Sequence, residues 1–89
     1  ELTILTLKTR LMMIVTKLIQ DAGYNQVEAA SVLKVTQPRE SNLMNGKISK
    51  FSIDMLIEML GRLGYLMDVS FDLSSKENPI SVIVKKSAV

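Results

Sequence analysis

Residues 25–46 read NQVEAASVLKVTQPRESNLMNG, and this stretch decides the fold because it encodes two short helices with a tight turn between them. Asn25 can cap the first helix, and Glu28, three residues later, can bond back to the cap in a capping box. Thr36 can cap the second helix, and Gly46 can end it because glycine tolerates the left-handed backbone found after many helices. The predicted helices run over residues 26–33 and 37–45.

This arrangement is that of a helix-turn-helix, in which the second helix enters the major groove of DNA. Small side chains at Ala29 and Ala30 let the second helix cross closely over the first. The second helix opens with Gln37, Pro38 and Arg39, so amide and guanidinium groups stand at the end that reaches the groove. Pro38 suits a first helical turn, which needs no amide donor from it. The motif therefore predicts DNA binding through the second helix.

The distribution of charge agrees with this prediction. The chain has 11 basic and 9 acidic residues, and its net charge of +2 is too low for the total alone to indicate nucleic-acid binding. Residues 34–50 carry four basic side chains against one acidic one, whereas residues 51–75 are acidic by three. A solvated surface could produce this pattern, but its coincidence with the motif favours a phosphate-facing surface, with Lys47 and Lys50 as the candidate contacts.

The segments around the motif predict a small helical domain followed by two strands. Apolar residues recur every three or four positions, which predicts further helices over about residues 6–21 and 52–63. The predicted inward residues of all four helices and the turn are Leu7, Leu11, Ile14, Val15, Leu18, Val27, Ala30, Leu33, Val35, Leu43, Met44, Ile53, Leu56, Ile57, Leu60 and Leu63. The six methionines are interpreted mainly as core-filling residues.

The apolar period changes to two near the C-terminus, which predicts strands over residues 67–73 and 80–85. Two strands alone are marginally stable, so they either cover the helices or pair with the same strands of a second copy. We favour the second alternative, because a two-fold dimer would join the strand edges and supply two reading helices. The expected organisation is a helix-turn-helix domain over residues 1–64 and a dimerising β extension over residues 65–89.

The composition argues against several other classes of protein. The chain has no histidine and no cysteine, so it lacks the usual general base, thiolate nucleophile and metal ligands, and we expect no enzyme, metal or cofactor. Aromatic residues make up only 4%, which disfavours a base-stacking RNA module. No run approaches the roughly 18–20 apolar residues that cross a bilayer, and no signal peptide is recognisable. We therefore expect a cytoplasmic protein with no membrane partner.

Several runs of this sequence match the pattern of a known family, and they are Asn25-Gln26, Glu28-Ala29-Ala30, Thr36-Gln37-Pro38-Arg39, Asn42-Leu43 and Asn45-Gly46-Lys47. Together they resemble the Xre/Cro-repressor helix-turn-helix family, over roughly residues 8–71. The stretch from Lys47 to Phe51, with Ser52 to Leu56 and an apolar strand after it, resembles the HigA-type antitoxin branch. The resemblance implies a mainly α, lambda-repressor-like bundle of four to five helices with a C-terminal β-strand or hairpin.

The resemblance also implies roles for the matching residues. Gln26 stands where the family's glutamine holds a phosphate, and Gln37 stands where its members read a base edge, typically that of adenine. Arg39 and Asn42 lie on the exposed side of the same helix, and the loop beyond it grips the next phosphates. The predicted DNA-binding residues are Gln26, Thr36, Gln37, Arg39, Ser41, Asn42, Asn45, Lys47 and Lys50.

Antitoxins of this branch repress their own operon as dimers and neutralise a RelE-like ribonuclease toxin. The resemblance therefore implies a sequence-specific repressor that binds an operator duplex as a homodimer and has a RelE-like toxin as a partner. The alternative is a protein-interaction module that neutralises such a toxin and binds DNA only secondarily, with its C-terminal strand adding to the partner's sheet. A small structural or RNA-associated protein is a third, weaker alternative.

Two residues depart from the family's pattern. Glu40 occupies a position that is usually apolar and faces the core, so its carboxylate either tips outward or weakens the domain. Lys34 lies in the turn where a glycine is common, so a residue with a side chain must adopt a backbone conformation that often has positive φ.

Overall fold

The computed structural model describes residues 3–71, 74 and 80–87, with the backbone alone for 69–71 and 80–82. These residues form four α-helices, one 3-10 helix and two strands: α1 (Ile4–Ala22), α2 (Gln26–Leu33), α3 (Gln37–Met44), η1 (Ile48–Lys50), α4 (Ile53–Arg62), β1 (Tyr65–Phe71) and β2 (Ile80–Lys86). The predicted helices are all present, so the mainly α architecture with a C-terminal hairpin is confirmed. Helix α1 begins earlier than predicted because Thr3 caps it, accepting a hydrogen bond from the Thr6 N–H at 3.0 Å.

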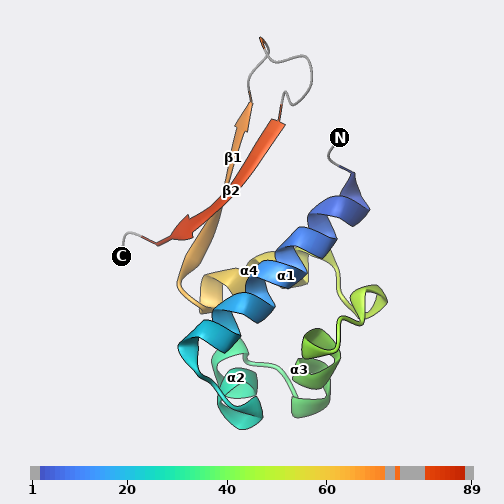
Figure 1. Ribbon diagram of the computed structural model, residues 1–89, viewed down its shortest axis with the longest axis vertical. Helices are drawn as coiled ribbons and strands as arrows, with labels where there is room; N and C mark the ends of the chain where they lie inside the picture. The colour runs from blue at the N-terminus through green and yellow to red at the C-terminus, as the bar shows by residue number, and fades with distance from the viewer. Residues whose placement is uncertain (1–2, 72–73, 75–79, 88–89) are drawn as a thin grey trace.

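One hydrophobic core holds the helices together, with α1 packed along α4 and the α2–α3 pair closing one end (Figure 1). Its buried members are Leu11, Met12, Val15, Ile19, Ala29, Leu33, Leu43, Phe51, Leu56, Met59 and Leu60. The prediction that Val27 points inward is wrong, because this side chain is 60% exposed. Helix α2 buries Ala29, Ala30 and Leu33 instead, and the 3.6-residue period places Val27 off that face.

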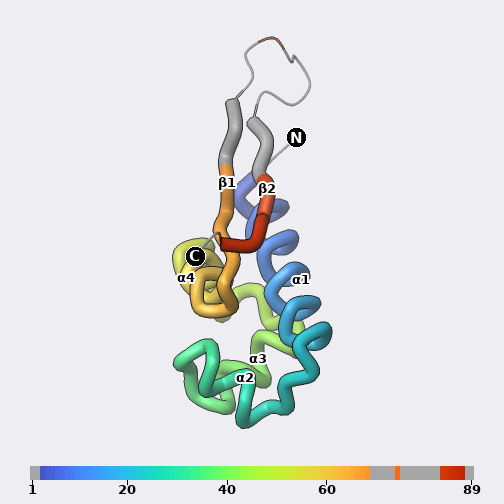
Figure 2. Tube along the Cα trace, turned by 90° about the vertical axis from the view of Figure 1, so that its left-hand side faces the viewer, coloured from blue at the N-terminus to red at the C-terminus, as the bar shows by residue number. Residues whose placement is uncertain are grey.

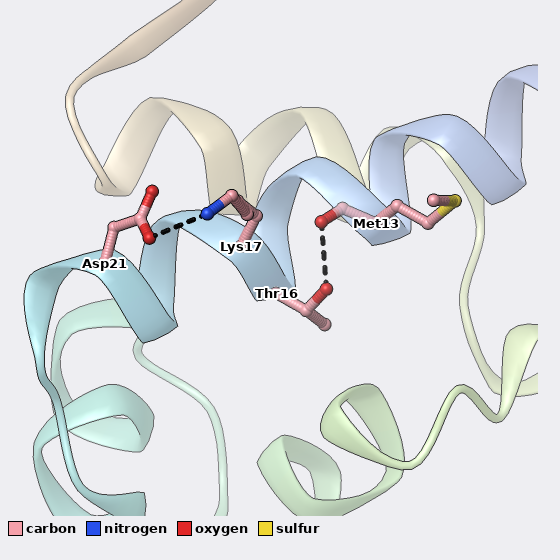
Figure 3. Close-up of polar contacts among 4 residues, drawn as sticks. All are labelled: Met13, Thr16, Lys17 and Asp21. Carbon is pink, nitrogen blue, oxygen red and sulfur yellow. Dashed lines mark hydrogen bonds and ion pairs between the residues drawn. The ribbon is translucent and has the colours of Figure 1, made fainter.

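The interpretation of the methionines as core-filling residues holds for some of them. Met12 and Met59 are buried, whereas Met13 on α1 is 65% exposed. Figure 3 shows the polar contacts next to Met13, where the Thr16 hydroxyl donates to the Met13 carbonyl at 2.9 Å and Lys17 pairs with Asp21 at 3.0 Å. Neither α1 nor any other helix among the described residues is long and apolar enough to span a membrane.

The C-terminal hairpin rises from the end of α4, on the opposite side of the molecule from α2 and α3 (Figures 1 and 2). Its strands are antiparallel, with Met67 opposite Val84, and both of these side chains pack against the core. The other face of the hairpin carries the exposed residues Leu66 and Ile83. Both strands extend beyond the predicted bounds, β1 at its start and β2 at its end, and residues 72–73 of the predicted first strand lie outside the described residues.

Candidate DNA interface

The turn between α2 and α3 is shaped by the backbone of Lys34. Its φ of 56° is left-handed, as the sequence predicted for this position. The N–H of Lys34 bonds to the Ser31 carbonyl at 3.2 Å and that of Val35 to the Ala30 carbonyl at 3.0 Å, which ends α2 in a pattern usually completed by glycine. Ala29 of α2 is fully buried in the core, and α3 packs directly against α2.

Helix α3 begins at Gln37 with its first turn at the surface. Thr36 precedes it in an extended conformation, and its hydroxyl accepts a hydrogen bond from the Arg39 N–H at 3.3 Å. Pro38 lies within the first turn, where its fixed φ favours the helical backbone. Gln37 and Arg39 are both exposed. The local sequence thus fixes where α3 starts and places polar side chains at that end.

The start of α2 meets the start of α3 through Gln26. Asn25 and Glu28 form the predicted capping box, with hydrogen bonds of 2.8 and 3.0 Å between each side chain and the other's backbone N–H. Beside this cap, the Gln26 side-chain amide donates to the Gln37 carbonyl at 3.4 Å. The residue predicted to hold a phosphate and the residue predicted to read a base therefore lie together at one edge of the molecule.

The outward side of α3 continues through Ser41 and Asn45, which lie one turn apart and are joined by a 3.4 Å hydrogen bond between their side chains. Asn42 is half-buried beside them, and its carbonyl accepts the Lys47 N–H at 3.0 Å. Gly46, with φ of 70°, lets the chain turn sharply out of α3. The structure therefore gathers four predicted site residues around the second half of α3 and the turn after it, and they are Ser41, Asn42, Asn45 and Lys47.

The loop after α3 carries the two lysines predicted to contact phosphates. Lys47 and Lys50 are exposed at either end of η1. Phe51, which follows them, is only 3% exposed and joins the core cluster, so the loop is anchored at its far end. Lys47 contacts the end of α3, whereas Gln26 and the Lys50 carbonyl both contact residues of its first turn, so the predicted phosphate contacts lie around α3.

The Arg39 side chain turns back toward the loop and α4. Its Nη1 lies 3.4 Å from the Lys50 carbonyl oxygen and 3.9 Å from the sulfur of Met55. Its Cζ lies 5.9 Å from the centre of the Phe51 ring, within the range of a cation–π contact. The contact with DNA predicted for Arg39 would therefore compete with contacts inside the protein.

Glu40 faces inward and is 5% exposed, so the alternative in which it tips outward is wrong. Desolvation raises the pKa of this carboxyl, because burial penalises its charged form. None of the ion pairs found among the described residues includes it. Within residues 34–50 the exposed charges are therefore all basic, and they belong to Lys34, Arg39, Lys47 and Lys50.

Sequence reasoning missed Arg62, which supports the motif from behind. Its Nη1 donates to the carbonyl of Leu33, the last residue of α2, at 2.9 Å, and its Nη2 pairs with Glu58. This bond satisfies a carbonyl that the end of a helix leaves without an intrahelical partner. The spacing of Glu58 and Arg62 could have indicated the ion pair, but no local signal points to a residue 29 positions away.

Comparisons with known proteins agree with this geometry. A family model described as a helix-turn-helix domain matches residues 1–72. A solved structure described as "Putative XRE Family Transcriptional Regulator" is 30% identical, with a TM-score of 0.67, and the match covers 93% of this chain and 89% of that one. No curated protein matched significantly. The expectation of a non-enzymatic protein agrees with these matches, whereas the HigA-type branch remains a prediction. The chain belongs to the XRE family of helix-turn-helix transcriptional regulators.

Proposed function

We propose that this protein is a sequence-specific DNA-binding repressor whose helix α3 lies in the major groove. The observation that carries the proposal is the row of exposed and half-buried polar side chains from Gln26 along α3 to Lys50, from which the one acidic residue of α3, Glu40, is turned inward. Such a row suits a phosphate backbone on both sides of the helix and base edges between them. Repression would be steric, because a bound protein excludes other proteins from the same duplex.

Within this row, the phosphate contacts and the base contacts come from different residues. Gln26, Lys47 and Lys50 flank α3 and would set the register on the duplex, with Thr36 and Asn45 adding to the phosphate contacts. Gln37, Ser41 and Asn42 lie on α3 itself, and the amide groups among them can pair with adenine in the major groove. Each good base contact would contribute roughly 1–3 kcal/mol of discrimination.

The test is selection of bound duplexes from a random pool, followed by titration of the selected duplex and of scrambled ones. Lys47→Ala should weaken binding to all duplexes alike and reduce the slope of log affinity against log salt concentration by about 0.9. Lys17→Ala is the matched control, because Lys17 is an exposed lysine on α1, outside the motif and the hairpin, and it should change neither quantity.

The same selection separates base reading from phosphate binding. Gln37→Ala should flatten the preference at one base pair, whereas Gln20→Ala, which removes an exposed glutamine from α1, should leave the preference intact. If Lys47→Ala and Gln37→Ala gave the same profile across the pool, the division of roles would be wrong. If scrambled duplexes competed as well as the selected one, sequence-specific binding itself would be wrong.

We further propose that the hairpin makes the protein a dimer that reads two half-sites about one helical turn apart. Its two-stranded sheet leaves one edge of each strand unpaired among the described residues, and the face away from the core exposes Leu66 and Ile83. Light scattering should give the mass of a dimer, and the selected duplexes should be palindromic. The double variant Leu66→Asp, Ile83→Asp should lower the mass toward that of a monomer while the helical domain stays folded.

The same hairpin supports an antitoxin role in the cytoplasm, in which the protein neutralises a RelE-like ribonuclease and represses their shared operon. An open strand edge beside exposed apolar side chains suits addition to a partner's sheet. Cells that express a small basic ribonuclease encoded beside this chain should stop growing, and co-expression of this chain should restore their growth. The Leu66→Asp, Ile83→Asp variant should fail to do so, whereas Lys47→Ala should still protect. Protection by both variants would contradict docking through the hairpin.

A further inference from the structure

We propose that Arg39 positions the loop that carries Lys47 and Lys50, and does not itself read a base. This inference rests on the proposed function, because it assigns a role within the same DNA interface. Arg39 stands at the third position of α3, where the sequence pattern suggests direct readout of DNA. In the structure its guanidinium is instead engaged with the segment that follows α3.

The contacts of the Arg39 guanidinium come from three consecutive parts of that segment. The Lys50 carbonyl, 3.4 Å from Nη1, belongs to the last residue of η1, where a helix leaves carbonyls without intrahelical partners. The Phe51 ring lies under Cζ at 5.9 Å, and the Met55 sulfur lies 3.9 Å from Nη1. One side chain therefore joins the first turn of α3 to η1, to the residue after it and to α4.

This connection determines where the two lysines stand relative to α3. Phe51 is buried in the core and fixes the end of the loop, while Lys47 and Lys50 before it are exposed. The connection spans 11 residues of sequence, from position 39 to position 50. Arginine suits this role because its planar fork stacks on a ring and donates to a carbonyl at once, which a lysine ammonium cannot do in the same geometry.

The test compares Arg39→Ala and Arg39→Lys by titration with the selected duplex and with scrambled duplexes. Both variants should weaken binding to every duplex by roughly tenfold and to similar extents, with the base preference unchanged. Met55→Leu, which removes the sulfur and nearly keeps the volume, should produce a smaller loss of the same uniform kind. Arg10→Lys, at an exposed arginine on α1, is the matched control and should have no effect.

A double-mutant cycle with Lys50→Ala separates positioning from direct contact. If Arg39 places the loop, Lys50→Ala should cost much less in the Arg39→Ala background than in the wild type, because the lysine is no longer held in place. Additive losses would overturn the inference. So would a flattened preference at one base pair in Arg39→Ala, which marks a base contact, or full affinity in Arg39→Lys, which marks a simple phosphate contact.

These results also distinguish this inference from the proposed function. A wild-type chain that binds no duplex above background would overturn both. Specific binding by the wild type with additive losses in the cycle would overturn the positioning role alone. The unfolding midpoint of each variant, measured alongside, shows whether the loss arises in the folded protein, and Arg39 is exposed enough for these substitutions to leave the core intact.

Discussion

Helix α3 and the C-terminal hairpin each carry a leucine, and the two leucines differ in how far they are buried. Leu43, on the reading helix, is 0% exposed, whereas Leu66, on the hairpin, is 51% exposed. The helices surround most of the core, and α3 packs on it through Leu43. The hairpin covers the core with one face and offers the other to solvent. The difference teaches that α3 leaves no large apolar side chain exposed, whereas the outer face of the hairpin exposes two.

The largest expected effect on stability tests this contrast directly. Leu43→Ala should destabilise the protein by about 2–5 kcal/mol, because it leaves a cavity in a packed core, whereas Leu66→Ala should change the free energy of unfolding by less than about 0.5 kcal/mol. Urea denaturation at low protein concentration, where association contributes least, measures both. A large loss in Leu66→Ala would show that a second copy or partner already covers the outer face of the hairpin.

The next largest effect on stability is expected at Arg62, which supports the motif from behind. Arg62→Met should cost about 1–3 kcal/mol, because the Leu33 carbonyl loses a charged donor at 2.9 Å in a partly buried place. Glu58→Ala removes only the exposed ion pair to Arg62 and should cost less than about 1 kcal/mol. Thermal unfolding of the two variants gives the comparison. Equal losses would mean that Arg62 stabilises the protein through its ion pair with Glu58 and not through its hydrogen bond to α2.

Glu40 is the exception within the helical domain, since it is a carboxylate at a buried position. Glu40→Val should raise the free energy of unfolding by about 1 kcal/mol at neutral pH. Because burial raises the pKa of this group, its cost is fully present above the pKa in the folded protein and absent below the pKa in the unfolded chain. The advantage of the variant should therefore shrink as the pH falls through the raised pKa.

Denaturation of wild type, Glu40→Val and Glu40→Gln across this pH range tests the argument. Glu40→Gln has no titrating group at this position, so its difference from Glu40→Val should stay constant with pH. Removing the carboxylate from the reading helix should also raise affinity for the selected duplex. A pH-independent advantage of Glu40→Val over wild type would show that the gain comes from packing alone.

The smallest expected effect concerns the turn. Lys34→Gly relieves a left-handed conformation that costs a residue with a side chain about 1–2 kcal/mol, but glycine adds flexibility to the unfolded chain. The net gain should be about 0.5 kcal/mol. Lys34→Ala keeps the conformation and should show no gain, while losing the same charge. The midpoints of urea denaturation compare them, and equal stability of the two variants would contradict strain at this residue.

Prediction from sequence succeeded where the interactions are local. The capping box of Asn25 and Glu28, the Thr36 cap and the left-handed turn at Lys34 all join residues at most five positions apart, and the bounds of α2 were predicted without error. It failed at Val27, because a short helix offers too few turns for an apolar pattern to fix its buried face. It also did not find Arg62, whose partner is distant in sequence.

The sequence by itself determined the helix-turn-helix and the residue types on its reading helix, because caps, turns and periodicity depend on neighbours within a turn or two. Only the tertiary structure decided that Glu40 faces the core, that Arg39 turns back to Lys50 and that Arg62 supports α2. Those orientations depend on which segments meet in space, and a side chain with several available rotamers settles where distant residues offer it contacts.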